Sequence, residues 1–241
     1  MAESSRFPRN QLVSQSVESA KNATSHTPKW RSLRTLTRES GPAGSYDDDM
    51  PKPRPTKAEL LAAADKTIRD VIDHGLKVLF CGINPGLYTA AIGHHYGRPG
   101  NRFWPSLHAG GFTPRLLDPS EERELLPLGY GLTNVVARAS AGENDLTPDE
   151  IRAGGKILRR KVLKYRPRVL AVCGLGAYRV AFDRPKAVVG PQDDHIGDTK
   201  LWVLPNPSGL NAHYQVSNLA VLFGALREFV EESTATPVPR G

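Results

Sequence analysis

Short apolar segments, separated by longer amphipathic or polar stretches, set the pattern of the chain from about residue 56 onward. Mostly apolar runs at 78–81, 168–173 and 201–204 have the length of strands, and turn residues such as Gly or Pro follow each of them. A further run at 132–136 contains Thr133 and Asn134, so it is interpreted as a short strand or the loop after one. The pattern therefore predicts four strands with longer segments between them.

Helix starts are marked by capping patterns, in which a Thr or Asp is followed three residues later by Glu. Thr56 begins one such pattern, and apolar residues spaced through 60–72 predict a helix that continues until Gly75. Asp118 begins a short helix, and Thr147 begins a long one that ends near Tyr165. Further helices are expected near 103–107, 175–182 and 216–231, and a long loop is expected over 184–199.

Strands that alternate with helices are typical of a parallel sheet covered by helices on both faces. The chain is therefore expected to be an α/β protein with three layers, α/β/α, around a central, mainly parallel sheet of four to five strands. Residues 1–55 are polar and proline-containing with little hydrophobic periodicity, which predicts a disordered tail and linker. The folded domain is expected over 56–232 and a frayed end over 233–241.

Composition and charge narrow the classes of protein to consider. With 39% hydrophobic residues and no apolar run of about 18 residues, a core is expected and a membrane span is not. No apolar signal segment is visible, and Cys81 and Cys173 lie in predicted strands, so a cytoplasmic protein with reduced thiols is expected. The formal charge of +7 lies almost entirely after residue 49, which favours attraction to nucleic acid or, less strongly, to an acidic membrane surface.

Two of the predicted strands are followed by Asn-Pro segments, at Asn84-Pro85 and Asn206-Pro207. Because parallel strands point their carboxyl ends to one edge of the sheet, both segments are expected at the rim where α/β proteins bind ligands. Asn, Pro and Gly are also ordinary turn residues, so either segment alone would favour a simple turn. Two such segments, with a cluster of histidine and aromatic residues at 94–96, favour a functional site.

Other kinds of site fit the sequence less well. Gly174 and Gly176 follow a strand as in a dinucleotide-binding loop, but Arg179 stands where the third glycine belongs and no phosphate-binding Gly-Lys-Ser/Thr occurs. The pair His94-His95 has no carboxylate or cysteine near it in the sequence, so no metal is expected. The sequence also lacks the Gly-x-Ser-x-Gly pattern of a serine nucleophile.

Three motifs together resemble the mismatch-specific uracil/thymine DNA glycosylase family, part of the uracil-DNA glycosylase superfamily. These are GINPG at 82–86, GHHYGRPGNRFW at 93–104 and LPNPSGL at 204–210. The resemblance covers about 65–231 and leaves the first 50 residues outside. It implies a DNA-repair hydrolase with a uracil-DNA glycosylase-like fold and no cofactor. Such an enzyme flips uracil, in some members thymine or a modified pyrimidine, out of the duplex and cleaves its N-glycosidic bond to leave an abasic site.

The same resemblance implies roles for individual residues. Asn84 matches the catalytic asparagine; an amide is too weak a base to take a proton, so it would hold the attacking water by its carbonyl oxygen. Main-chain N–H groups around Ile83 would stabilise the departing anionic base. Tyr96 would stack on the flipped base. Other residues expected to line the base pocket are Thr89, His95 and Thr133.

The segment from Asn206 to Asn211 resembles the part that enters the duplex. Leu210 would fill the space that the flipped base leaves. The residues assigned to this DNA contact are Asn206, Ser208, Gly209, Leu210 and Asn211. Here Asn211-Ala212 replaces a Ser-Arg pair of some relatives, and Asn134 occupies a position where some relatives have lysine, so both roles stay open.

The expected partner is double-stranded DNA with a G·U or G·T mismatch, bound by a monomer that would be nucleoid-associated if the protein is bacterial. Two alternatives stay open. One is a catalytically weak or inactive module of the same fold that only binds mismatched DNA. The other is a nucleotide enzyme that acts on free deoxyuridine without salt-dependent affinity for DNA.

Overall fold

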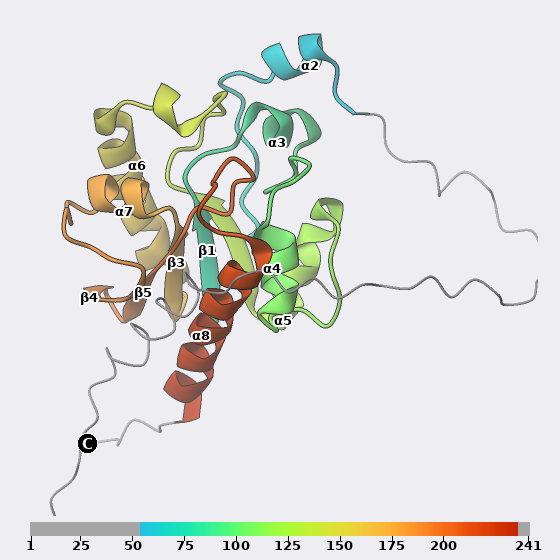
Figure 1. Ribbon diagram of the computed structural model, residues 1–241. Helices are drawn as coiled ribbons and strands as arrows, with labels where there is room; N and C mark the ends of the chain where they lie inside the picture. Colours follow the sequence, from blue (N-terminus) through green and yellow to red (C-terminus); the bar gives the residue numbers. More distant parts are fainter. Residues whose placement is uncertain (1–53, 236–241) are drawn as a thin grey trace, which may run out of the picture.

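The computed structural model describes residues 54–235 and, of the side chains, residues 54–232; the tail predicted over 1–53 and the last six residues lie outside this part. Its centre is a five-stranded sheet with the strand order β2-β1-β3-β5-β4, shown in Figure 1. Four strands are parallel, and only β4, at one edge, runs antiparallel to its neighbour. The predicted mainly parallel sheet is confirmed. The strands are β1 (Val78–Gly82), β2 (Tyr130–Asn134), β3 (Val169–Cys173), β4 (Gly190–Ile196) and β5 (Thr199–Leu204).

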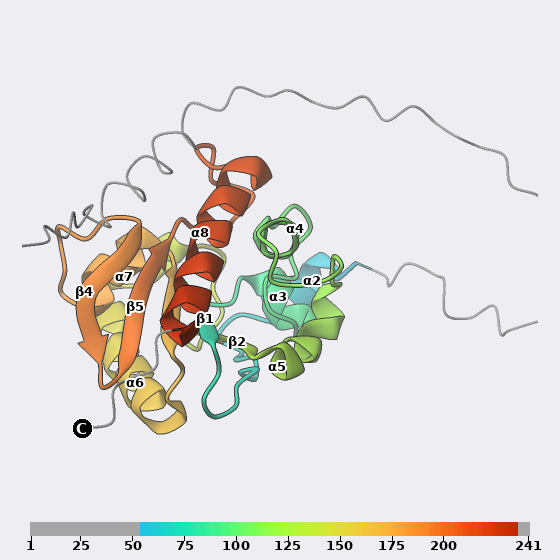
Figure 2. The same ribbon diagram turned by 90° about the horizontal axis from the view of Figure 1, so that it is seen from below.

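Helices cover both faces of this sheet, which confirms the three-layer arrangement (Figure 2). On one face lie α4 (Phe103–Ala109), α5 (Leu125–Leu128) and α8 (Val216–Ala235). On the other lie α6 (Pro148–Tyr165) and α7 (Leu175–Ala181). The short helices α2 (Lys57–Leu61) and α3 (Leu87–Ile92) and the 3₁₀ turns Pro119–Glu124 and Glu143–Asp145 complete the described part. The capping boxes predicted at Asp118 and Thr147 are present.

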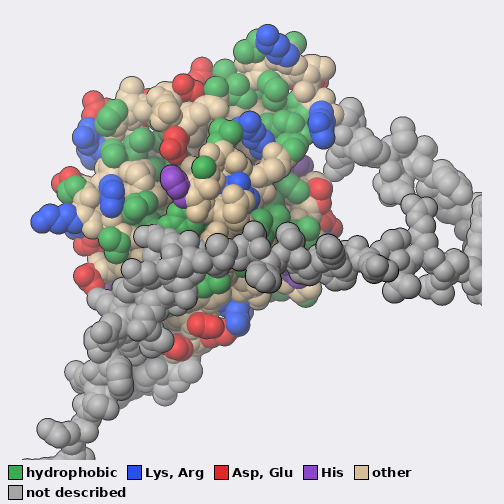
Figure 3. Space-filling view, in the orientation of Figure 1, with side chains coloured by type: hydrophobic (Ala, Val, Ile, Leu, Met, Phe, Trp, Pro, Cys, Tyr) green, Lys and Arg blue, Asp and Glu red, His purple; other side chains and the backbone are tan. Residues whose placement is uncertain are grey.

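The surface of the folded part carries mixed charge. On the face shown in Figure 3, Lys and Arg side chains are scattered among Asp and Glu side chains and do not gather into one basic band. Within the described residues, no helix is both long and apolar enough to cross a lipid bilayer. The positive charge that favours a polyanion is therefore not concentrated on this face.

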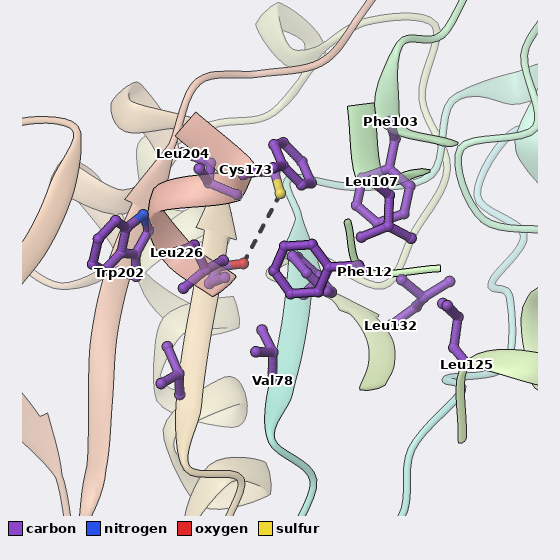
Figure 4. Close-up of a cluster of buried hydrophobic side chains, with 14 of the residues drawn as sticks. Val78, Phe103, Leu107, Phe112, Leu125, Leu132, Cys173, Trp202, Leu204 and Leu226 are labelled. Carbon is purple, nitrogen blue, oxygen red and sulfur yellow. Dashed lines mark hydrogen bonds between the residues drawn. The ribbon is translucent and has the colours of Figure 1, made fainter. Parts of the chain in front are cut away.

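The core follows from the two-residue alternation of β1, all of whose residues are buried. Successive side chains of a strand point to opposite faces of its sheet. Phe80 accordingly packs on the α8 side against the rings of Phe103, Phe112 and Phe223, whereas Cys81 packs on the α6 side. Figure 4 shows the first of these clusters, which joins β1, α4 and α8. This packing holds the carboxyl end of β1 in place.

The long helix predicted from Thr56 to Gly75 is wrong, because only Lys57–Leu61 is helical. Asp65 has a φ of 60°, in the left-handed region that a continuing right-handed helix cannot use. Beyond it the chain is extended, and Val71 exchanges two backbone hydrogen bonds with Leu132 of β2, of 3.0 and 2.7 Å. The apolar residues after 65 therefore cover the outer edge of β2 instead of one side of a helix.

The long loop predicted over 184–199 is also wrong, because β4 occupies Gly190–Ile196 and pairs with β5. A tight turn joins the two strands, and Gly197 provides the left-handed residue, with a φ of 59°. The prediction failed because Pro191 and two aspartates made β4 resemble a loop. Proline is tolerated there because β4 is an edge strand with an irregular register between Pro191 and His195.

Gly154→Ala is expected to destabilise the protein although it lies in the middle of helix α6. Alanine is favoured over glycine in a helix by about 1 kcal/mol. An added Cβ at Gly154, however, would lie 2.3 Å from the carbonyl oxygen of Val135, in the segment just after β2, and such overpacking costs about 1–3 kcal/mol. Urea unfolding should show a lower free energy of unfolding for Gly154→Ala. Gly176→Ala in helix α7, where nothing lies within 4 Å, should show no loss.

Candidate functional site

A cleft of about 640 Å³ opens at the carboxyl ends of β1, β2, β3 and the chain after β5. This is the rim predicted from the two Asn-Pro segments, and both segments line it. A second hollow, of about 450 Å³, lies at the opposite end of β3 and β5 and contains none of the predicted site residues. The predicted residues that line the cleft are Ile83, Asn84, Thr89, His95, Tyr96, Asn206, Ser208, Leu210 and Asn211.

Asn84 is held by its amide nitrogen. Its Nδ2 donates to the carbonyl oxygens of Pro85 and Arg138, both at 3.2 Å, and to Oγ of Ser140 at 2.8 Å. A flipped amide would place Oδ1 against the two carbonyl oxygens, so these contacts fix its orientation. Oδ1 then has no hydrogen-bond partner among the described residues and is available to accept a hydrogen bond in the cleft. The arrangement can hold a water molecule as a nucleophile.

Ser140 is a cleft residue that sequence reasoning missed. It is 5% exposed, and its Oγ accepts from Asn84 while donating to the carbonyl oxygen of Gly142 at 2.6 Å. The signal was its position, in the polar segment that follows a third parallel strand, β2, toward the same rim. Ser140 fixes the amide of Asn84 from the side opposite the main chain.

Tyr96 lies in the cleft with a φ of 53° and is backed by the ring of Phe103. The two ring centroids are 3.9 Å apart and the planes differ by 9°. Burial raises the pKa of Tyr96 well above its usual value, so its hydroxyl is neutral. Beside it, Cys173 at the end of β3 also lines the cleft. Phe103 therefore holds Tyr96 as a flat aromatic wall.

A buried carboxylate orients His95, contrary to the expectation that none lies near His94-His95. Glu122 Oε2 accepts from the backbone N–H of His95 at 2.7 Å and lies 3.0 Å from its Nδ1, and Oε1 lies 3.3 Å from Nδ1 of His94. Burial by itself would raise the pKa of Glu122, but the hydrogen bonds from His95 and His94 lower it below its usual value. The carboxylate is therefore ionised, and it leaves Nε2 of His95 buried and unpartnered among the described residues, in a ring that lines the cleft.

The predicted pocket residue Thr133 does not line the cleft. It is fully buried, and its Oγ1 donates to Asp70 and accepts from Lys161, both at 2.7 Å, on the side of helix α6. The alternation of β2 turns the next residue, Asn134, into the cleft instead. Thr89, from α3, does line it. Within the described residues, no three His, Cys, Asp or Glu side chains come close enough to hold a metal ion.

The segment from Asn206 to Asn211, here named the β5 loop, forms one wall of the cleft. Leu210 is 74% exposed at its tip, while Gly209 lies outside the lining and packs on the backbone of Gly100. Asn206 Nδ2 donates to Glu143 at 3.1 Å, a carboxylate on the opposite wall that sequence reasoning missed. The β5 loop thus presents an apolar tip beside the Asn84 site.

Arg138, whose carbonyl oxygen holds Asn84, is itself held by Glu150 of helix α6. Its Nη2 donates to Oε2 of Glu150 at 3.1 Å. Hydrogen bonds from Arg138 and from the capping residue Thr147 lower the pKa of Glu150 from 4.5 to about 2. The loop that carries Ser140 is therefore tied to α6 by an ion pair.

Acidification is expected to weaken this tie. Because the pKa of Glu150 is lower in the folded than in the unfolded chain, its contribution to stability is complete above about pH 4.5 and is lost as the pH falls toward 2. Glu150→Gln should therefore be less stable than wild type at pH 6, with a difference that closes between pH 4.5 and 2 in urea unfolding. Glu228→Gln, at an exposed position of α8, should show no such pH-dependent difference.

Comparison with known proteins matches this part of the chain to a family. The family model described as the uracil DNA glycosylase superfamily matches residues 69–229, which include every residue that lines the cleft. Among solved structures, a solution NMR structure of a candidate uracil DNA glycosylase from Methanosarcina acetivorans is similar to this chain. The identity is 18%, the match covers 69% of this chain and 98% of that chain, and the TM-score is 0.46.

Proposed function

This chain belongs to the uracil DNA glycosylase superfamily, and from that premise we propose that it is a monofunctional DNA glycosylase acting on uracil mispaired with guanine. It flips the base out of the duplex and hydrolyses the N-glycosidic bond, leaving an abasic site. The observation that carries the proposal is the fixed amide of Asn84, whose Oδ1 faces a cleft with no partner among the described residues. The mismatch preference rests on the sequence motifs.

The chemistry follows from the weak basicity of an amide. Asn84 Oδ1 holds a water molecule against the sugar but cannot remove its proton before attack. The glycosidic bond therefore breaks ahead of the attack, and the base leaves as an anion from an oxocarbenium-like sugar. Main-chain N–H groups beside Ile83 are the donors proposed to stabilise that anion.

Recognition of the base uses the walls of the cleft. Tyr96, backed by Phe103, offers a flat face on which an extruded pyrimidine stacks, worth about 1–3 kcal/mol. Leu210 enters the duplex from the β5 loop and replaces the lost stacking. Because a mispaired base is easier to extrude, G·U pairs are preferred over A·U pairs. Thymine opposite guanine is a further substrate under this proposal.

The proposal is tested with labelled duplexes that contain a single G·U, A·U or G·T pair, followed by alkaline cleavage of abasic sites. Strand cleavage is expected for G·U, more slowly for the other two, and only after alkali. Tight binding of the G·U duplex without excision would support the alternative of a binding module. Release of uracil from free deoxyuridine, without affinity for DNA, would support a nucleotide enzyme instead.

A further inference from the structure

The β5 loop owes its shape to Arg102, which immediately precedes helix α4. Arg102 Nη1 donates to the carbonyl oxygens of Ser208 at 3.1 Å and Asn211 at 2.7 Å, and Nη2 donates to that of Gly209 at 3.4 Å. The backbone N–H of Arg102 also donates to the carbonyl oxygen of Pro207 at 2.9 Å. One residue thus gathers four carbonyl groups of the loop on one side.

The remaining carbonyls of the loop are nearly all engaged as well. The oxygen of Asn206 accepts from Nδ2 of Asn211 at 2.9 Å. Within the described part of the chain, Leu210 alone in the loop has a carbonyl oxygen without a hydrogen bond. The inner side of the loop is therefore built from carbonyl oxygens and closed by a cation.

Turning carbonyls inward turns amide N–H groups outward. In a trans peptide the C=O and the following N–H point in opposite directions, and the chain contains no cis peptide among its described residues. The carbonyls of Ser208 and Asn211 face Arg102, so the N–H groups of Gly209 and Ala212 point away from it. Neither N–H has a hydrogen-bond partner in residues 54–235. Two free donors therefore face outward beside the tip residue Leu210.

We propose that Arg102 is a positioning residue, which orients the β5 loop so that the N–H groups of Gly209 and Ala212 bind a DNA phosphate. This inference rests on the proposed function and adds the means by which the loop grips the duplex. Outward N–H groups at successive turns of a chain are suited to anions. They also suit a surface without a continuous basic band, and a loop in which position 212 is alanine and supplies no cation of its own.

Arg102 itself is occupied by this task. Its guanidinium spans three carbonyl oxygens in different directions, which a planar fork of donors can do. A lysine ammonium keeps the charge but lacks that fixed geometry. Arg102→Lys therefore separates the shape of the loop from the net charge of the surface.

The test measures binding of the full chain to a duplex that carries a stable abasic-site analogue opposite guanine, so that no catalysis is needed. Arg102→Lys is expected to weaken binding by about 10-fold or more, as for the loss of a hydrogen bond to a charged group. The slope of log affinity against log salt should fall by about 0.9, the value for one phosphate contact. Arg115→Lys, exposed and paired with Glu121 and Glu124 instead, should change neither quantity.

A second pair of variants removes the donor without touching Arg102. Ala212→Pro deletes one of the two N–H groups and should reproduce both the weaker binding and the smaller slope, whereas Ala212→Ser keeps the N–H and should not. Hydrogen exchange over 206–213 should become faster in Arg102→Lys. Wild-type affinity and slope in both Arg102→Lys and Ala212→Pro would overturn the inference. Wild-type protein that binds this duplex but excises no base would overturn the proposed function alone.

Discussion

Replacing Asn84 with alanine is expected to lower kcat for uracil excision from a G·U duplex by about 100-fold or more, with little change in KM. The reason is that Oδ1 of Asn84 contacts the attacking water and not the DNA. Without the amide, nothing holds the water at the angle of attack, whereas Tyr96 and the β5 loop still bind the base and the duplex. Single-turnover excision on a labelled G·U duplex measures the effect.

Two further variants sharpen this result. Ser140→Ala removes one of the three acceptors that orient the amide, so it should lower kcat by less than Asn84→Ala does. Gln192→Ala removes another side-chain amide, one that donates to three carbonyl oxygens on the edge strand β4 far from the cleft, and should leave kcat unchanged. Full activity of Asn84→Ala would contradict the proposed role.

Replacing Phe103 with alanine is expected to lower the free energy of unfolding by about 3–5 kcal/mol, because it empties the centre of the α8-side cluster. Phe103 is fully buried and makes ring contacts with Phe80 and Phe223 in addition to Tyr96. Urea unfolding at neutral pH measures the loss. Leu116→Ala, at a position that is 54% exposed, should change stability by less than about 0.5 kcal/mol.

Phe103→Leu tests the second role of this residue. Leucine retains most of the buried volume, so the stability cost should stay below about 1.5 kcal/mol. It does not retain the flat face behind Tyr96, however, so KM for the G·U duplex should rise while the protein stays folded. An unchanged KM in Phe103→Leu would show that Tyr96 holds its position without an aromatic support.

The parts of the site that sequence reasoning reached are those encoded by a strand and the residues right after it. A buried strand fixes where its own carboxyl end lies, so Asn84 and the β5 loop could be placed on one rim before any coordinates were available. The capped starts of α6 and of the turn at Asp118 are equally local. Such features need only the alternation of β-strands and the chemistry of helix ends.

The contacts that hold the site were not predicted, because their partners lie far apart in the chain. Glu122 reaches His95 across 27 positions, Ser140 reaches Asn84 across 56, and Arg102 reaches the β5 loop across more than 100. No local pattern indicates which carboxylate or hydroxyl will arrive. The misplaced Thr133 has the same origin, since a shift of one position along a strand moves a side chain from one face to the other.

The two mispredicted segments share a consequence for solubility. An open sheet presents a row of unpaired N–H and C=O groups at each edge, where another chain can add itself as a strand. Here the strap around Val71 occupies the edge of β2, and Pro191 with Asp193 and Asp194 makes the edge of β4 irregular and negatively charged. The stretches that resembled a helix and a loop thereby act as edge guards, and they discourage cross-strand aggregation at both ends of the sheet.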